Sequence, residues 1–353
     1  MSSELRTDLL TGRQVIVAPG RSDRPGAIAV DPPLAAENDP FLESNERETP
    51  QETLALRTTD SQPNHAGWLL RVVPNRYPMV SRIADAMPHA GSESNAPADT
   101  IAGAHEVVIE CPDGRSRLTE LTIAEISRIL LAWQKRVHFL EAQAGTEVVS
   151  VFRNQGFSAG ASLLHSHSQI VATNCVPPLL EERIRRAEEH RLTTGDELVE
   201  QLLQREREFG QRIVRYGRDM AVFCPFASRA NLHVRWLPTE KSKLQFQTLN
   251  TCDLLDLAAS LFSVARAIDD LAERASLNLV LSLPPTRSRD AFRWMLDLLP
   301  RTSRIAGFEL MTDVDIITMP PETAASLLRE NITWQPAPDE QASLFPSGYQ
   351  WRP

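Results

Sequence analysis

The chain has 353 residues, of which 42% are hydrophobic and 24% charged, as in ordinary folded globular proteins and unlike largely disordered ones. The formal net charge of −9 argues against a nucleic-acid binder, because no dense block of lysine and arginine could neutralise a phosphate backbone. No apolar run approaches the roughly 18 residues of a membrane-spanning helix, and the polar start is unlike a signal peptide. We therefore expect a cytoplasmic protein that does not insert into membranes.

Short runs rich in valine, isoleucine and leucine recur in the first half of the chain and predict β-strands. They cover residues 14–18, 68–73, 105–110, 148–152 and 169–172. We expect these strands to share one sheet. A capping box formed by Thr122 and Glu125 precedes apolar residues at helical spacing up to Leu140, which predicts a helix lying across that sheet.

The second half repeats this order. Residues 181–216 have helical spacing interrupted near Gly195, which predicts two exposed helices that connect the halves. Strand patterns return at residues 221–225 and 232–237, an amphipathic helix follows near residues 254–273, and two more strand patterns come at residues 278–283 and 291–296. From residue 333 onward the composition predicts an irregular strap, whose Trp351 we expect to be packed.

Two histidines, His165 and His167, are spaced so that both side chains fall on one face of a strand, and Gln169 continues that face. A neutral imidazole is a competent nucleophile toward phosphorus, and Gln169 can donate hydrogen bonds to phosphoryl oxygens. Upstream, residues 154–162 form a loop of small residues that ends at Ser162, another donor, and that could approach a phosphate closely. The spacing alone leaves three interpretations open: half of a metal site, a structural polar cluster and a nucleophile.

The segment from Asn154 to Gln169, with its His-x-His-x-Gln motif, resembles the galactose-1-phosphate uridylyltransferase branch of the histidine-triad superfamily. Further matches follow in the same order at residues 11–19, 24–25, 73–78, 224–229, 278–281 and 299–309. The resemblance implies an α+β fold of two histidine-triad-like repeats, each an antiparallel sheet with flanking helices. Residues 1–185 would form the first repeat, and residues 186–353 the second, with the connector helices and the strap.

By this resemblance the enzyme is a nucleotidyltransferase of the UDP-glucose:hexose-1-phosphate uridylyltransferase type. His167 would attack the α-phosphorus of a UDP-sugar, and a hexose 1-phosphate would accept the uridylyl group in a ping-pong cycle. The main chain at His165 would orient His167, while Gln169 and Ser162 would hold phosphate oxygens. The other implied substrate-binding residues are Arg21, Arg24, Asn75, Arg76, Tyr77, Asn154, Gly160, Phe308 and Glu309.

The chain departs from the family where many relatives bind metal. Asp39 to Leu42 stand in place of a Cys-Pro-x-Cys zinc motif, and Arg293 and Met295 replace a second His-x-His pair. We therefore expect no metal cofactor, with another cation at Asp39 and nearby His105 as a less favoured alternative. Leu164 and Ser166 replace prolines common beside the nucleophile. We expect Ser166 to leave this segment slightly freer.

Two other functions share these residues. An adenylyltransferase or phosphorylase acting on ADP-sugars or dinucleoside polyphosphates would use the same motif. A non-catalytic nucleotide-sugar-binding paralogue would account for the lost metal ligands. The joint presence of His167, Gln169, Ser162 and Asn154 favours catalysis. The resemblance also implies a homodimer.

Overall fold

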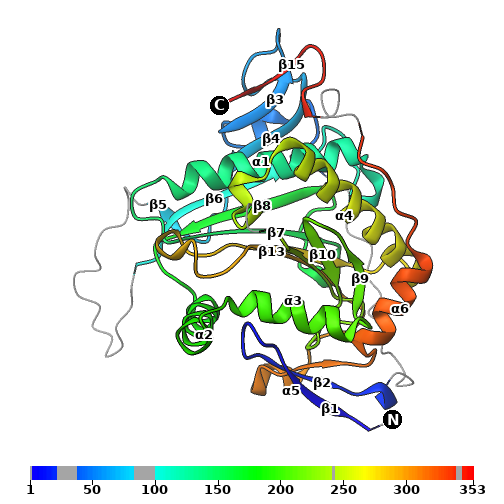
Figure 1. Ribbon diagram of the computed structural model, residues 1–353. Helices are drawn as coiled ribbons and strands as arrows, with labels where there is room; N and C mark the ends of the chain where they lie inside the picture. Colours follow the sequence, from blue (N-terminus) through cyan, green and yellow to red (C-terminus); the bar gives the residue numbers. More distant parts are fainter. Residues whose placement is uncertain (1, 22–37, 83–99, 241–242, 339–343) are drawn as a thin grey trace.

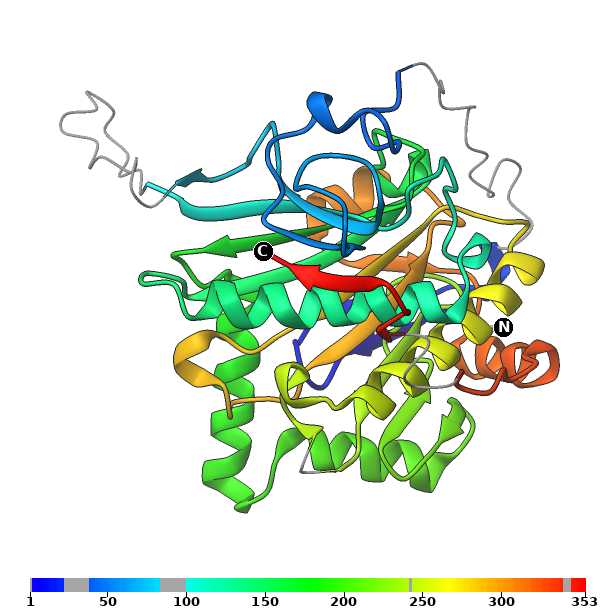
Figure 2. The same ribbon diagram turned by 90° about the horizontal axis from the view of Figure 1, so that it is seen from above.

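A computed structural model describes residues 2–21, 38–82, 100–240, 243–338 and 344–353. A 12-stranded sheet runs through this part of the chain in the order β15-β3-β4-β6-β8-β7-β12-β13-β11-β10-β9, with β5 paired to β6. Figures 1 and 2 show this sheet from two directions, with α1 and α4 along it. The α+β fold class predicted from the sequence is confirmed.

The first half of the sheet surrounds the strand that carries the predicted nucleophile. Its elements are β3 (Leu54–Thr58), β4 (Trp68–Pro74), β5 (Ser81–Arg82), β6 (Ala102–Ile109), α1 (Ile123–Glu141), β7 (Val148–Gln155) and β8 (His167–Thr173). The predicted capping box at Thr122 is present, since its hydroxyl accepts from the Glu125 N–H and the Glu125 carboxylate accepts from the Thr122 N–H. It fixes where α1 begins.

The second half follows the same plan. Its elements are β9 (Ile213–Tyr216), β10 (Met220–Phe223), β11 (Val234–Pro238), α4 (Thr251–Leu271), β12 (Leu277–Ser282) and β13 (Met295–Pro300). Helix α4 also starts at a capping box, formed by Asn250 and Asp253. The halves join where β7 pairs with β12, so the predicted repeats share one continuous sheet. The predicted boundary at residue 185 falls inside α2 (Pro178–Thr194), and the division into two domains stays a prediction.

The registers of the two halves correspond. In the first half, Gln169 of β8 lies between Val107 of β6 and Phe152 of β7. In the second half, Asp297 of β13 lies between Arg235 of β11 and Val280 of β12. Gln169 and Asp297 therefore occupy equivalent positions, two residues after His167 and Met295, which begin the two strands.

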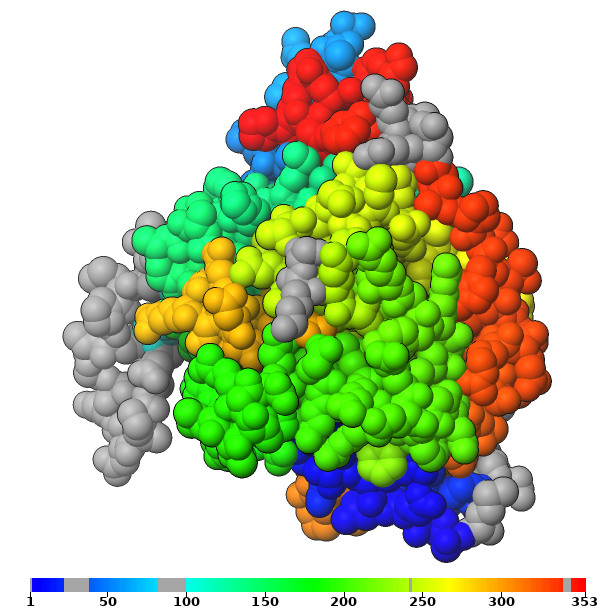
Figure 3. All heavy atoms as spheres, in the orientation of Figure 1, coloured from blue at the N-terminus to red at the C-terminus, as the bar shows by residue number. Residues whose placement is uncertain are grey.

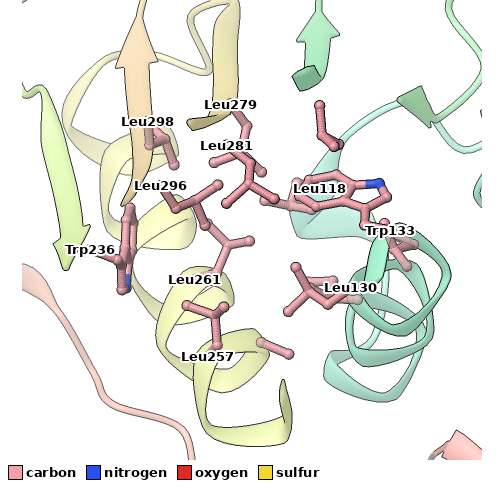
Figure 4. Close-up of a cluster of buried hydrophobic side chains, with 14 of the residues drawn as sticks. Leu118, Leu130, Trp133, Trp236, Leu257, Leu261, Leu279, Leu281, Leu296 and Leu298 are labelled. Atoms are coloured by element: carbon pink, nitrogen blue, oxygen red, sulfur yellow. The ribbon is translucent and has the colours of Figure 1, made fainter. Parts of the chain in front are cut away.

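The main hydrophobic core lies between the sheet and the pair α1 and α4. Leucines and tryptophans from both halves interdigitate there (Figure 4). Both tryptophan indoles keep hydrogen bonds, from Trp133 Nε1 to Ser168 and from Trp236 Nε1 to Ser260. Each fully buried leucine contributes about 1.5–3 kcal/mol. This core holds β8 rigidly from one side and leaves the opposite face for His167.

On that opposite face, the second half is covered by α3 (Leu198–Phe209). The prediction of two exposed helices holds for α2, where only Arg183 is buried, but is wrong for α3. Four of its apolar residues pack with Phe223, Leu237 and Met295; they are Leu198, Val199, Leu202 and Leu203. The break between the helices falls at Gly195, which adopts φ +83° as a helix C-cap.

A separate three-stranded sheet joins β1 (Glu4–Thr7) and β2 (Gln14–Val17) to β14 (Asp315–Ile317), so the strand predicted at residues 14–18 lies outside the main sheet. Next to it are α5 (Gly307–Thr312) and, later in the chain, α6 (Pro321–Asn331). The predicted strap ends in β15 (Tyr349–Arg352), which pairs with β3, so Trp351 lies in a strand. In both places a segment from early in the chain lies beside one from late in the chain. Figure 3 shows this on the surface, with blue beside orange at one end of the molecule and beside red at the other.

One strand prediction is misplaced. Residues 291–296 were expected to form the last strand of the second half, but β13 begins at Met295. Phe292 and Trp294 are buried in the approach to the strand, so the apolar run starts before the extended backbone. No helix in the described part of the chain is both long and apolar enough to cross a membrane.

Candidate active site

His167 begins β8 and is oriented by its own main chain. Its Nδ1 lies 2.7 Å from the carbonyl oxygen of His165, and because a carbonyl only accepts, Nδ1 carries the hydrogen. Burial, with the side chain 7% exposed, lowers the pKa of His167 to about 4. The imidazole is therefore neutral near pH 7, and its Nε2 has a free lone pair.

His165 lies just before β8 rather than on it, in a polar cluster. Its Nδ1 is 2.7 Å from Asp39 Oδ2, and its Nε2 donates to the carbonyl oxygen of Cys111 at 2.8 Å. The Phe41 ring packs edge-on against both His165 and His167. Asp39 and His165, which stand where the resemblance implies zinc ligands in relatives, thus lie together with Cys111. Asp39 contacts His165, whereas His105 contacts Gln169 and Met79. The alternative of a cation at Asp39 with His105 nearby stays a prediction.

A buried ion pair supports this segment from the core side. Arg153 and Glu110 are each about 1% exposed and contact one another directly. The Ser166 hydroxyl donates to Glu110 Oε2 at 2.7 Å and accepts from Arg153 Nη1 at 2.9 Å, and its N–H donates to the Arg115 carbonyl oxygen. Burial lowers the pKa of Arg153 to about 9, which still leaves it charged. The expectation that Ser166 leaves the segment before β8 slightly freer is wrong, because the hydrogen bonds of Ser166 hold this segment in place.

Three more predicted residues lie near the end of β7, which shares the face of His167: Asn154 on the strand, and Gly160 and Ser162 in the loop that follows. Asn154 points to this face, and its Oδ1 accepts from Asn278 Nδ2 of β12 at 2.8 Å. Asn278 in turn accepts from Arg301 Nε. Gly160 has φ +86°, which glycine adopts without strain, and Asn154 Nδ2 lies beside it. Ser162 is exposed on the loop.

Gln169 connects this group to a cavity at the other end of β8. Its Oε1 lies 2.8 Å from His105 Nε2, and Asn75 Nδ2 lies 3.1 Å from the same nitrogen. Asn75 Oδ1 accepts from the Tyr77 N–H, which shapes the predicted turn. Asn75 and His105 line a cavity of about 670 Å³ together with Pro78, Met79, Ile101 and Gly103. This volume is in the range of small-molecule sites.

The remaining predicted binding residues lie farther from this group. Arg76 and Tyr77 are exposed at the turn, with the guanidinium over the ring. Arg21 is exposed after β2, and Phe308 and Glu309 lie on α5 beside the small sheet (Figure 1). Glu309 accepts from the N–H of Ala306, the N-cap residue of α5. Arg24 lies outside the described residues.

The described residues contain no group of three His, Cys, Asp or Glu side chains arranged to hold a metal ion. Arg293, at the position of the second His-x-His pair, binds Glu197 and Glu200 of the α3 region and the carbonyl oxygen of Pro238. The absence of a metal cofactor stays a prediction.

The same fold occurs in known proteins. A profile of the galactose-1-phosphate uridyl transferase N-terminal domain matches residues 1–177. The chain belongs to this family. ADP-glucose phosphorylase of Arabidopsis thaliana is 28% identical over 337 residues, 93% of each chain, and galactose-1-phosphate uridylyltransferase of Haemophilus influenzae is 24% identical over 59% of each chain. The predicted family and the predicted nucleotidyltransferase class of enzyme are confirmed.

Solved structures of this family superpose over almost the whole chain. The crystal structure of the Arabidopsis thaliana ADP-glucose phosphorylase with bound ADP-glucose has a TM-score of 0.76 and 27% identity, and covers 93% of this chain and 99% of its own. A uridylyltransferase structure matches with a TM-score of 0.70 and 21% identity over 94% and 98% of the chains. The second comparison shows the fold alone.

Sequence reasoning missed three groups around His167. They are the Arg153–Glu110 pair, the Asn278–Arg301 contact with Asn154, and the position of His105 against Gln169. Only His105 left a signal, since it alternates with Val107 on a predicted strand. The others depend on strand pairing between distant segments.

Proposed function

We propose that this chain transfers a nucleotidyl group from a nucleotide sugar through a covalent intermediate on His167, with an ADP-sugar such as ADP-glucose as donor. The observation that carries the proposal is the state of His167. Its Nδ1 hydrogen is held by the His165 carbonyl oxygen, while Nε2 keeps its lone pair because burial lowers the pKa to about 4. This is the state in which an imidazole attacks phosphorus.

In the first step Nε2 of His167 attacks the α-phosphorus, and the bond from that phosphorus to the bridging oxygen breaks. The sugar 1-phosphate leaves with the bonding electrons. Nδ1 stays protonated and bonded to the His165 carbonyl oxygen, which stabilises the positive charge that develops on the ring. The amides of Gln169 and Asn154 and the hydroxyl of Ser162 would donate to the phosphoryl oxygens.

In the second step an oxygen of inorganic phosphate attacks the same phosphorus, and the phosphorus–nitrogen bond breaks. Its electrons return to Nε2, and ADP is released. The choice of an ADP-sugar and of phosphate follows the Arabidopsis relative, which matches 93% of this chain and whose structure holds ADP-glucose. The cavity beside Asn75 and His105 would receive the nucleoside. Arg76 and Tyr77 lie in the turn that follows Asn75.

A second candidate is UDP-glucose:hexose-1-phosphate uridylyl transfer by the same chemistry. It is supported by the family profile over residues 1–177 and by the Haemophilus influenzae relative. In this reaction the acceptor is a hexose 1-phosphate. The two activities differ in the base of the donor nucleotide, adenine or uracil, and in the acceptor, phosphate or a hexose 1-phosphate.

The test compares ADP-glucose and UDP-glucose labelled at the phosphate next to the nucleoside. We expect ADP-glucose to leave an acid-labile, base-stable label on His167 that phosphate releases as ADP. A label from UDP-glucose that only a hexose 1-phosphate releases would support the second candidate. His167→Asn should remove the label, while the matched variant His65→Asn, in an exposed loop, should keep it. Label on His167→Asn, or none on the wild type from either donor, would overturn the proposal.

We also propose that the enzyme needs no metal and acts as a cytoplasmic homodimer. Arg21 follows β2, and Phe308 and Glu309 lie on α5; within the described part of the chain none of the three contacts His167. A partner subunit would bring such residues to the sugar. Activity after chelation and the mass in sedimentation equilibrium test these two points, and a monomer of about 39.4 kDa would contradict the dimer.

A further inference from the structure

His105 is a buried histidine in β6 with a defined partner at each ring nitrogen. The backbone N–H of Met79 lies 3.2 Å from Nδ1, and Oε1 of Gln169 lies 2.8 Å from Nε2. A backbone N–H can only donate, so Nδ1 must hold the lone pair. A neutral imidazole then carries its hydrogen on Nε2 and donates it to Gln169. Burial lowers the pKa of His105, which keeps the ring neutral near pH 7.

The amide of Asn75 also lies 3.1 Å from Nε2 and would compete for this nitrogen as a donor. Both ring nitrogens cannot accept at once in a neutral imidazole. The Met79 N–H belongs to the main chain and cannot turn away, whereas the Asn75 side chain lines the cavity and its amide hydrogens can face a ligand there. The contact with Met79 therefore decides the tautomer.

The second half of the chain contains the same arrangement with no ambiguity. The Arg229 N–H lies 3.2 Å from Nδ1 of His233, and Nε2 of His233 lies 3.1 Å from Oδ1 of Asp297. Burial and Arg235 lower the pKa values of His233 and Asp297 respectively, so the ring is neutral and the carboxylate ionised near pH 7. A carboxylate only accepts, so Nε2 of His233 is the donor. His105 and Gln169 occupy the equivalent register, which supports the same proton position in the first half.

We propose that His105 is a positioning residue that sets the orientation of the Gln169 amide for nucleotidyl transfer. By holding Oε1 of Gln169, His105 leaves the two N–H groups of that amide for the phosphoryl oxygens beside His167. The reverse orientation would direct a carbonyl oxygen at an anion. No hydrogen bond to Nε2 of Gln169 is recorded among the described residues, as expected for donors kept for a ligand. The inference rests on the proposed function.

The kinetic test is a double-mutant cycle between His105 and Gln169, read as the single-turnover rate of His167 labelling. We expect His105→Leu to slow labelling by at least about tenfold, up to the 10²–10³-fold that loss of one preorganised donor costs, with a smaller change in nucleotide affinity. His105→Gln keeps an N–H donor near the position of Nε2 and should recover much of the rate. In a Gln169→Ala background, His105→Leu should change the rate by less than about twofold.

The matched control is His233→Leu, which removes the equivalent contact from the other half and should leave the labelling rate per folded molecule unchanged. Full loss from His105→Leu in the Gln169→Ala background, or wild-type rates in His105→Leu, would overturn the inference. Nitrogen NMR of ¹⁵N-histidine protein reads the tautomer without any activity. A hydrogen on Nδ1 of His105 would overturn the inference even if labelling succeeds, whereas wild-type protein that never labels would instead defeat the proposed function.

Discussion

The two halves of the sheet share a scaffold but differ on the face opposite α1 and α4. In the first half this face carries His167, Gln169 and His105 beside a cavity. In the second half the position of His167 is held by Met295, which is 1% exposed and packs under α3. The comparison teaches that a duplicated strand framework can keep polar chemistry in one copy and turn the same face into a packing surface in the other.

The difference extends to charge at one register position. Gln169 offers neutral amide donors, whereas Asp297 is a largely buried carboxylate, 13% exposed, bonded to Arg235 at 2.7 and 3.1 Å. Burial alone would raise the pKa of Asp297, but the Arg235 guanidinium and His233 hold it well below its usual range. A charged carboxylate there excludes a phosphate, so the second half cannot copy the site.

The sharpest way to break the comparison is to give the first half the residue of the second. Gln169→Asp should lower the rate of His167 labelling by about 10³-fold or more, because it removes a donor and directs a negative charge at the phosphoryl group. The asparagine of Gln169→Asn has the same length as the aspartate but carries no charge, so this variant should lose less of the labelling rate. The rates come from single-turnover labelling. Equal losses in the two variants would show that charge is not the reason for the difference.

Removing the charge at the equivalent position of the second half should lower the stability of the fold and leave the rate of His167 labelling unchanged. Asp297→Asn should lower the free energy of unfolding by about 3 kcal/mol, because the buried Arg235 loses its closer charge partner and keeps only Asp8, at 3.5 Å. The folded pKa of Asp297 is lowered, so its contribution is full above the unfolded value near 4 and is lost as the pH falls toward the folded value. Urea unfolding of both proteins at several pH values measures this gap, which should shrink only below about pH 4.

Asp315 provides the control for that measurement. It pairs with Arg229 at a more exposed position, with 37% of the arginine side chain accessible. Asp315→Asn should cost less than about 1 kcal/mol. Similar costs for the two substitutions would mean that burial does not set the strength of the Asp297 contact.

Ser166 offers a third test, since Trp294 stands at its position in the second half. Ser166→Pro should lower the free energy of unfolding by about 2–4 kcal/mol, because it removes the N–H bonded to Arg115 and the hydroxyl shared by Arg153 and Glu110. Leu164→Pro, at the other position where relatives have proline, lies on the exposed loop and should cost less. Thermal or urea unfolding distinguishes them, and a harmless Ser166→Pro would contradict the fastening role.

The smallest expected effect is in the pH dependence of labelling. Neutral imidazole is the attacking form, and the pKa of His167 is lowered to about 4, so the fraction of active imidazole is nearly constant from pH 6 to 8. The labelling rate should change less than about twofold in this range and fall only as the pH approaches 4. A midpoint near the ordinary histidine value of about 6.5 would show that His167 is not desolvated as described.

Local patterns predicted much of this molecule. The capping box placed α1, and the alternation of His167 and Gln169 placed both on one face of β8, as observed. The pairing of β3 with β15 was missed because a strand as short as Leu54–Thr58, which includes the fully buried Arg57, shows no clear alternation. His105 lay on a predicted strand, but only the register between β6 and β8 brings it to Gln169.

The pairing of β3 with β15 also bears on how the protein is made. Thr58 pairs with Tyr349 and Leu56 with Trp351, so the edge of β3 finds its neighbour only after nearly all of the described chain has left the ribosome. Pairing between such distant segments is slow, and an unpaired edge is prone to associate with other chains. The half that carries His167 emerges first and is completed last, which leaves the edge of β3 without its neighbour until β15 has been synthesised.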